Sequence, residues 1–196
     1  MLIYMIRHGQ TDWNAEGRLQ GQKDISLNAL GRVQASRNGE MLLRVPGSDI
    51  AGFDFVSSPL SRTRETMERL RGAMGLNPDD YRIDERLLEL SFGDWEGQTL
   101  EEVGRIAPER VVARLEQKWN FIPPGPSAES YEILSWRVGA WLRSLAGPTV
   151  AVTHGGVVRS VFRLVTNLSE DQAATMTVPQ DKILKVDLAD GTLHWF

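Results

Sequence analysis

The sequence predicts an α/β fold: a three-layer α/β/α sandwich with a mainly parallel sheet and an antiparallel edge strand. Two observations lead to this prediction. Short apolar runs of strand length alternate along the chain with longer segments of helical periodicity, and this alternation is typical of parallel sheets covered by helices on both faces. Near the end of the chain, Asp190-Gly191 separates two strand-like runs, which indicates a β-hairpin that can give the sheet an antiparallel edge.

Continuous apolar runs, rich in β-branched or aromatic residues, predict the strands. The buried strands are expected at Leu2–Ile6, Phe53–Ser57 and Thr149–Thr153. The first run is bounded by Arg7, and the third run is the richest in β-branched residues. A shorter candidate strand lies near Tyr81–Asp84, and the edge hairpin pairs Lys182–Leu188 with Leu193–Phe196.

Helical patterns fill the segments between these runs. Asn28 is a good N-cap for a helix over Ala29–Leu43, and the next helix starts at Ser58-Pro59, where a first turn tolerates proline. Further helices are expected at Pro108–Trp119, Glu129–Leu145 and Val157–Val165. The Pro/Gly-rich stretch 121–127 is too short for an interdomain linker and predicts a loop. We therefore expect a single domain over residues 1–196 with a small lid-like segment at about 98–135.

The composition excludes several classes of protein. The net charge is −4 and no Lys/Arg-rich run occurs, so the electrostatic footprint of a nucleic-acid-binding protein is absent. No apolar stretch reaches the ~18 residues of a membrane span, and the absence of cysteine removes disulfides, thiol nucleophiles and thiolate metal sites. With only three histidines, we expect no metal site, and we expect no cofactor. A reducing cytoplasm is the simplest location. The composition leaves open whether the protein forms a homodimer.

Polar side chains follow the predicted strands at their carboxyl ends, which is where open α/β sheets bind their ligands. The first strand ends in Arg7-His8-Gly9, and the third ends in Thr153-His154-Gly155-Gly156. Ser57-Ser58-Pro59 ends the second strand, Arg62 follows it, and Glu89 comes after the short strand. Two of the three histidines therefore share one structural context, each followed by glycine, at one edge of the sheet.

These residue types suit the transfer of a phosphoryl group, which carries its charge on three equatorial oxygens. Arg7 and Arg62 offer planar, multi-donor hydrogen bonding to such oxygens, and a neutral His8 imidazole can attack phosphorus in line. The glycine pair after His154 opens a helix, whose N-terminus attracts anions, and a protonated His154 would add a further donor. A carboxylic acid must then protonate the departing alkoxide, and Glu89 is the candidate.

Several segments together resemble the histidine phosphatase superfamily, the phosphoglycerate mutase-like group. They occur in the family's order at Arg7–Asn14, Leu27–Gly31 with Gln34-Ala35, Ser57–Thr66, Leu88–Gly97 and Thr153–Gly156. Any one of these motifs is a weak signal, but all of them in order are specific, and they extend from near residue 1 to past residue 156. The resemblance implies a phosphoglycerate mutase-like fold. Because no metal-ligand cluster is visible in the sequence and arginine and histidine can supply the positive charge, we expect an enzyme that needs no metal.

The resemblance also implies a role for each matching residue. His8 would become phosphorylated and Glu89 would donate the proton, while Arg7, Arg62 and His154 would hold the phosphoryl group. Asn14 and the Gln20-Gly21 backbone would lie near the phosphate. The candidate site residues are therefore Arg7, His8, Asn14, Gln20, Gly21, Arg62, Glu89, His154 and Gly155.

The chain departs from the family pattern at two places. Gln10 stands where the family often has glutamate. The family's Pro-Gly-Gly-Glu-Ser loop is replaced by the altered or lengthened stretch Pro124–Ser130, which leaves the substrate open.

Several candidates have a structural alternative. Arg62 could pair with Glu65 or Glu68 on its own helix, and Asn14 and Gln20 could simply fasten a loop. The competitors of Glu89 for the acid role are Asp84, Glu85 and Glu96. Three aromatic residues could line the pocket, although burial in a core is the commoner fate: Trp13, Trp119 and Phe121. The third histidine, His194, is expected to be an ordinary surface residue.

Three functions fit this pattern. The first is a phosphomonoester hydrolase acting on a small phosphorylated metabolite, the second is a phosphoglycerate mutase, and the third is a non-catalytic phospholigand-binding module. Only about fifty residues separate Gly97 from Thr149, so the lid is small. Because excluding water protects a reactive intermediate from hydrolysis, a small lid favours the hydrolase. The binding module is the least favoured interpretation, since every proposed catalytic residue is present.

Overall fold

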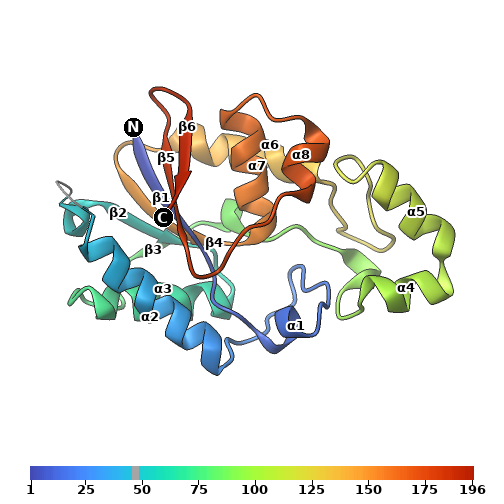
Figure 1. Cartoon of the computed structure of the whole chain (residues 1–196), viewed down its shortest axis with the longest axis horizontal. Helices are drawn as coiled ribbons and strands as arrows, with labels where there is room; N and C mark the ends of the chain where they lie inside the picture. Colours follow the sequence, from blue (N-terminus) through green and yellow to red (C-terminus); the bar gives the residue numbers. More distant parts are fainter. Residues whose placement is uncertain (46–48) are drawn as a thin grey trace.

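The computed structural model describes residues 1–45 and 49–196. Within these residues, six strands form one sheet in the order β3-β2-β4-β1-β5-β6 (Figure 1). The strands are β1 (Leu2–Arg7), β2 (Asp54–Ser57), β3 (Arg82–Ile83), β4 (Thr149–Thr153), β5 (Ile183–Asp187) and β6 (Thr192–Trp195). Every predicted strand is present, within a few residues of its expected bounds.

The pairing of the strands confirms the predicted mainly parallel sheet with an antiparallel edge. Strand β4 lies between β1 and β2 and is parallel to both, with Arg7 opposite Thr153 and Ser57 opposite Val152. Strand β5 pairs with β1 antiparallel, and β6 completes the hairpin at the edge. The carboxyl ends of β1, β2 and β4 consequently meet at one edge of the sheet, which is the edge that carries the candidate site.

Alternating side chains of β1 place one hydrophobic cluster on each face of the sheet. Ile3 and Met5 belong to one cluster and Tyr4 and Ile6 to the other, and all four are fully buried. Because successive side chains of a strand point to opposite faces, a continuous apolar run needs cover on both sides. The cover is α2 (Ala29–Leu43) with α3 (Ser61–Ala73) on one face, and α6 (Tyr131–Ser144) with α7 (Gly155–Val165) on the other (Figure 1).

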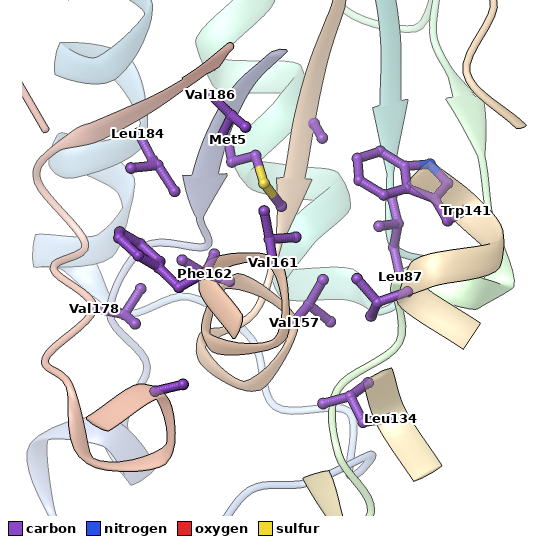
Figure 2. Close-up of a cluster of buried hydrophobic side chains, with 14 of the residues drawn as sticks. Met5, Leu87, Leu134, Trp141, Val157, Val161, Phe162, Val178, Leu184 and Val186 are labelled. Carbon is purple, nitrogen blue, oxygen red and sulfur yellow. The ribbon is translucent and has the colours of Figure 1, made fainter. Parts of the chain in front are cut away.

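The hydrophobic cluster under α7 is the larger of the two, and it holds α7, the helix that follows β4, against the sheet. Figure 2 shows Val157, Val161 and Phe162 of α7 beside Met5 of β1. Fully burying one aliphatic side chain of this size stabilises a fold by about 1.5–3 kcal/mol. Since Val157 and Val161 are fully buried, the N-terminus of α7 is held firmly at the edge of the sheet.

Helix bounds agree with the predictions where a capping signal is clear. Helix α2 begins at Ala29 as expected, and the Asn28 side chain accepts a hydrogen bond from the Gly31 amide. Helix α3 begins at Ser61 and not at Ser58-Pro59, because the backbone is still extended at Leu60, the N-cap. Helix α7 begins at Gly155, with His154 as its N-cap.

Three short helices were not predicted from the sequence: α1 (Asp12–Ala15), α4 (Leu100–Ile106) and α8 (Glu170–Thr175). Each begins with a capping box, in which the N-cap side chain and the residue three positions later bond each other's backbone amide. Helices of four to seven residues are too short for hydrophobic periodicity to reveal them.

Helices α4 and α5 (Pro108–Glu116) lie together at the end of the molecule opposite the chain termini (Figure 1). They fall inside the segment 98–135, which we call the lid segment. Helix α5 ends at Glu116, before the predicted Trp119, whose side chain is buried against Tyr131. None of the helices in the described residues combines the length and the apolar composition that crossing a membrane requires.

Candidate active site

A pocket of about 130 Å³ lies at the carboxyl ends of β1 and β4 and contains most of the predicted site residues. Its lining includes Arg7, His8, Asn14, Gln20, Gly21, Arg62, Glu89 and Gly155. His154 is fully buried beside it, with its ring centroid 5.2 Å from that of His8. Residues that are as far apart in the sequence as Arg7 and Gly155 therefore meet at one place, as the strand pattern predicted.

One ring nitrogen of His8 is hydrogen-bonded, and the other has no partner in the described residues. Its backbone amide donates to the Thr153 carbonyl at 2.9 Å, which anchors the end of β1 to β4. Its Nδ1 lies 2.7 Å from the Gly9 carbonyl oxygen, and since a carbonyl only accepts, Nδ1 carries the proton. Nε2 then keeps its lone pair, which is what a nucleophile needs.

The protonation state of His8 follows from its surroundings. Burial lowers the pKa of His8 well below 6.5, and the positive charges of Arg62 and Arg7 lower it further. The imidazole is therefore neutral at neutral pH, in agreement with a role as a nucleophile. The same two arginines that would bind an anion thus keep the nucleophile unprotonated before the anion arrives.

The Gly9-Gln10 turn after His8 is fixed by the start of helix α2. A Cβ atom on Gly9 would lie 2.2 Å from the Gly31 carbonyl oxygen, so only glycine allows this close approach. The Gln10 amide donates to Gln34 Oε1 at 2.9 Å, and Asn28 Nδ2 donates to Gln10 Oε1 at 3.0 Å. Gln10, one of the two departures from the family pattern, consequently has a positioning role here.

One buried ring nitrogen of His154 has no hydrogen-bond partner in the described residues. Its Nε2 lies 2.7 Å from Ser58 Oγ, whereas its Nδ1 is buried and has no partner among residues 1–45 and 49–196. The pKa of His154 is lowered well below 6.5. Burial is the largest cause, and electrostatic interactions with Arg62 and His8 lower the pKa further. If Ser58 donates to Nε2, Nδ1 carries a proton, so a neutral His154 can still donate to a bound anion.

Arg62 is a buried cation and Arg7 is a partly buried one, and neither forms an ion pair with the described residues. Arg7 donates to the Val178 carbonyl at 2.7 Å. Arg62 is fully buried and donates to the carbonyls of Gly21 at 2.8 Å and Lys23 at 2.6 Å. The Nε of each is buried without a partner in the described part of the chain, so each guanidinium keeps a donor for a ligand.

Both arginines remain positively charged at neutral pH in this environment. Burial lowers the pKa of Arg7 to about 10, and the carboxylate of Glu89 opposes this shift. Burial also lowers the pKa of Arg62, again opposed by Glu89. Arg62 pairs with neither Glu65 nor Glu68 of its own helix, because Glu65 bonds Arg32 at 2.7 Å and Arg69 at 3.0 Å, and Glu68 accepts a hydrogen bond from Tyr81 at 3.0 Å. Since buried cations are costly without a partner, the pocket favours an anionic ligand.

Glu89 is the carboxylate that lines the pocket together with Arg7 and Arg62. Its side chain accepts hydrogen bonds from the amides of Leu90 at 2.8 Å and Gly156 at 3.0 Å. Its own carbonyl accepts from Arg137 at 3.0 Å and Gln22 at 3.0 Å. The competitors lie elsewhere in the structure: Asp84 bonds Arg86, Glu85 is exposed, and Glu96 accepts from the amides of Gln22 and Phe92.

The loop after β1 contributes polar groups to the pocket. Asn14 Oδ1 accepts from the Thr11 amide and from Gln180, which leaves its amide nitrogen as the donor. Gln20 Oε1 is buried without a partner in the described residues. Gly21 has φ +53°, and a Cβ there would lie 2.0 Å from Glu96 Oε1, so this position requires glycine.

Two basic residues of the pocket were not predicted from the sequence. Arg159 lies on α7, one helical turn after Gly155, and lines the pocket. Arg18 also lines the pocket and bonds Glu16 at 2.6 Å and Glu102 of α4 at 2.9 Å. The signal for Arg159 is present in the sequence, because residues four apart share a helix face.

The three candidate aromatic residues are not among the residues that line the pocket. Trp119 stacks on Tyr131 with centroids 5.5 Å apart, and Phe121 stacks on Trp95 at 5.3 Å. Phe92 and Leu19 provide the apolar part of the lining instead. His194 is exposed on β6, opposite Lys185, as expected for a surface residue.

Comparisons with known proteins agree with this arrangement. Residues 3–195 match the model of the histidine phosphatase superfamily, branch 1. The chain is 32% identical over 180 residues to a glucosyl-3-phosphoglycerate phosphatase of Mycolicibacterium vanbaalenii, covering 86% of this chain and 76% of the relative. It is 37% identical over 201 residues to a probable phosphoglycerate mutase GpmB of Citrobacter koseri, covering 96% and 86% respectively. A crystal structure of phosphoglycerate mutase from Thermus thermophilus superposes with a TM-score of 0.72 at 35% identity, covering 95% of this chain and 93% of that one.

Proposed function

Because the chain belongs to the histidine phosphatase superfamily, we propose that it is a phosphomonoester hydrolase that transfers a phosphoryl group from a small metabolite to His8 and then to water. One observation carries this proposal. A neutral His8, whose Nε2 has no hydrogen-bond partner in the described residues, lies in a pocket with the partly buried Arg7 and the buried Arg62, neither of which has a carboxylate partner in those residues. This combination suits a phosphate dianion and in-line attack on it.

The first half of the reaction forms the phosphohistidine. The phosphoryl oxygens bind Arg7, Arg62 and the N-terminus of α7, which supply positive charge where the transition state needs it. The lone pair of His8 Nε2 forms a bond to phosphorus as the bond from phosphorus to the ester oxygen breaks. Glu89, in its carboxylic acid form, gives its proton to that departing oxygen, so that an alcohol leaves.

The second half of the reaction restores the enzyme. A water molecule attacks the phosphorus of the phosphohistidine, and the carboxylate of Glu89 takes the proton of that water. The bond between phosphorus and Nε2 breaks, inorganic phosphate leaves, and His8 returns to its neutral form with Nδ1 protonated. Glu89 thus serves as acid in one step and as base in the next. The positive charge comes from arginine and from backbone amides, so we propose that no metal ion takes part.

A phosphoglycerate mutase is the second candidate, and the relatives named as mutases favour it. The small lid segment favours hydrolysis, because we propose that residues 98–135 cover the site without excluding water. Chain length does not distinguish the two activities, because the match with the Thermus thermophilus mutase covers 95% of this chain and 93% of the mutase. The relative named as a glucosyl-3-phosphoglycerate phosphatase supports hydrolysis of a small phosphorylated metabolite.

The test is a screen for phosphate release from phosphorylated metabolites, run beside an assay for interconversion of 3- and 2-phosphoglycerate. We expect phosphate release from several esters and little interconversion. Faster interconversion than hydrolysis would assign the protein to the mutases. A chain that binds phosphate esters but turns over none of them would be a phospholigand-binding module, and the proposal would be wrong.

A further inference from the structure

Two fully buried polar side chains meet beside the pocket: Ser58, which follows β2, and His154, which follows β4. The His154 Nε2 lies 2.7 Å from the Ser58 Oγ. The Nδ1 of the same ring is buried and has no partner within residues 1–45 and 49–196. Because most buried polar groups are hydrogen-bonded, this nitrogen requires an explanation.

The backbone holds Ser58 in place at the end of β2. Its amide donates to the Val152 carbonyl of β4 at 3.1 Å. Its carbonyl accepts from the hydroxyls of Ser57 at 2.9 Å and Thr63 at 2.8 Å. The Ser58 hydroxyl bonds His154 and no other residue in the described part of the chain, so the sheet itself presents this hydroxyl to the ring.

The numbers of donors and acceptors determine the direction of this hydrogen bond. A hydroxyl has one proton to donate, and a neutral imidazole has one N–H and one lone pair. If Nε2 of His154 carried the proton, the hydroxyl proton and the Nδ1 lone pair would both lack partners in the described residues. If Ser58 donates to Nε2, only the Nδ1 proton lacks one. Because each unsatisfied buried polar group destabilises the fold, the second arrangement is favoured.

The two buried histidines then have the same tautomer for opposite reasons. The Gly9 carbonyl accepts from Nδ1 of His8, which leaves a lone pair on Nε2, as a nucleophile requires. The Ser58 hydroxyl occupies Nε2 of His154, which leaves an N–H on Nδ1. Since the ring centroids are 5.2 Å apart, a nucleophile and a neutral donor lie next to each other.

The surroundings of His154 favour a neutral donor over a charged one. Burial and the positive charge of Arg62 lower the pKa of His154 well below 6.5, and the charges of Arg137 and Arg7 act in the same direction. A protonated ring, which could donate from both nitrogens, is therefore disfavoured before an anion binds. Because Nε2 is already occupied, the tautomer alone decides whether the neutral ring can donate to a ligand.

We propose that Ser58 is a positioning residue that keeps the proton of His154 on Nδ1, so that this N–H donates to an oxygen of the phosphoryl group while His8 attacks. This inference rests on the proposed function, because it concerns the same transfer. Ser58 is not among the residues that line the pocket, so it acts through the ring of His154. Without the hydroxyl, the proton is free to move to Nε2, and a lone pair that repels the phosphoryl oxygens then replaces the donor.

Nuclear magnetic resonance can identify the tautomer in the resting protein. The chain has only three histidines, so protein labelled with ¹⁵N-histidine gives a simple long-range ¹H–¹⁵N spectrum, and His8→Ala and His194→Ala identify the signals of His154 by elimination. Above pH 6.5, where the ring is neutral, we expect a protonated Nδ1 and an unprotonated Nε2. Saturating inorganic phosphate should shift the Nδ1 signal.

Variants of Ser58 should change this spectrum in a defined way. Ser58→Ala should exchange the two nitrogen shifts or move them toward each other, whereas Ser58→Thr keeps the hydroxyl and should retain the wild-type pattern. A proton on Nε2 of His154 in the wild-type protein would overturn the inference, even if no Ser58 variant folds. A response of His8 to phosphate without one at Nδ1 of His154 would overturn it as well.

Kinetic measurements show whether the hydroxyl acts through His154. Ser58→Ala should lower kcat/KM for glycerol 3-phosphate about ten- to hundredfold, which is the size of one charged hydrogen bond. It should have no further effect in a His154→Ala background. Ser57→Ala removes a neighbouring buried hydroxyl that donates to a backbone carbonyl, so it should change neither the rate nor the tautomer. An equal loss in both backgrounds would mean that Ser58 acts elsewhere and would overturn the inference.

The two kinds of measurement separate this inference from the proposed function. Failure of the wild-type protein to release phosphate from any ester would overturn the proposed function. A proton on Nδ1 of His154 that responds to inorganic phosphate and is lost in Ser58→Ala would still support the role of Ser58. Phosphate release by a protein whose His154 carries its proton on Nε2 would overturn the role of Ser58 and leave the proposed function intact.

Discussion

Arg7 and Arg62, in the floor of the pocket, donate to backbone carbonyls, whereas Arg114 and Lys118, at the lid segment, have no such bonds within the residues described. The floor consists of Arg7, His8, Arg62 and His154. Its members lie at the ends of strands or at the start of helices that are packed into the two cores. The cations of the lid segment lie on and after one short helix, α5, most of whose side chains are exposed.

This difference separates two tasks. Groups that must stabilise the charge of a transition state are most effective when they are held in place before the reaction, and the carbonyls of Val178, Gly21 and Lys23 hold the floor arginines in this way. Groups that only recognise the rest of a substrate need less precise placement. We therefore expect the floor to determine the reaction and the lid segment to determine the substrate. The predictions below test that division.

The largest expected effect is the loss of the nucleophile in the floor. His8→Ala should reduce kcat by a factor on the order of 10⁴ or more and should abolish the acid-labile phosphoenzyme, detected with a ³²P-labelled substrate. His194→Ala, at an exposed position on β6, is the matched control and should leave both unchanged. A phosphoenzyme that persists in His8→Ala would mean that another residue is the nucleophile.

The second prediction concerns the proton donor. Glu89→Gln should slow the hydrolysis of alkyl phosphates by about 10²- to 10³-fold, because an alkoxide leaves poorly without a proton. The loss on p-nitrophenyl phosphate should be far smaller, since its leaving group needs little protonation. Glu85→Gln, an exposed carboxylate outside the pocket, provides the control. Equal losses on both kinds of substrate would argue against the acid role of Glu89.

The third prediction concerns the pH dependence of the floor. The pKa values of His8 and His154 are lowered well below 6.5, so both stay neutral above that value and hydrolysis of glycerol 3-phosphate should show no loss from histidine protonation until the pH falls below 6.5. The measurement is the pH profile of kcat/KM for glycerol 3-phosphate, and a loss from histidine protonation that begins above pH 6.5 would contradict the neutral state of both rings.

The smallest expected effect is that of chelation. In residues 1–45 and 49–196, no group of three or more His, Asp or Glu side chains could hold a metal ion, and we propose that arginine supplies the positive charge. Dialysis against EDTA should leave kcat/KM unchanged on every substrate. Loss of activity on dialysis, with recovery on adding a divalent cation, would contradict the proposed mechanism.

Much of the site could be predicted because its residues sit at strand ends. Once Leu2–Ile6 and Thr149–Thr153 are identified as buried strands, His8 and His154 must lie at the same edge of a parallel sheet. The same reasoning could not reach Arg18 or the cations of the lid segment. Arg18 is positioned by Glu102 and the Gly97 carbonyl, and nothing in the local sequence around Arg18 indicates those partners.

The sequence by itself determined the order and type of the long elements, because hydrophobic periodicity and capping residues act over a few neighbouring positions. It also indicated His8 as the candidate nucleophile, since His8 and Gly9 follow a strand that is apolar on both faces. Only the tertiary structure decided that Nδ1 of His8 is bonded, and that Arg62 bonds two carbonyls and, within the described residues, no carboxylate. It alone brought Arg159 of α7 to the pocket. These outcomes depend on burial and on charges distant in the chain, which reach each other only when the helices pack against the sheet.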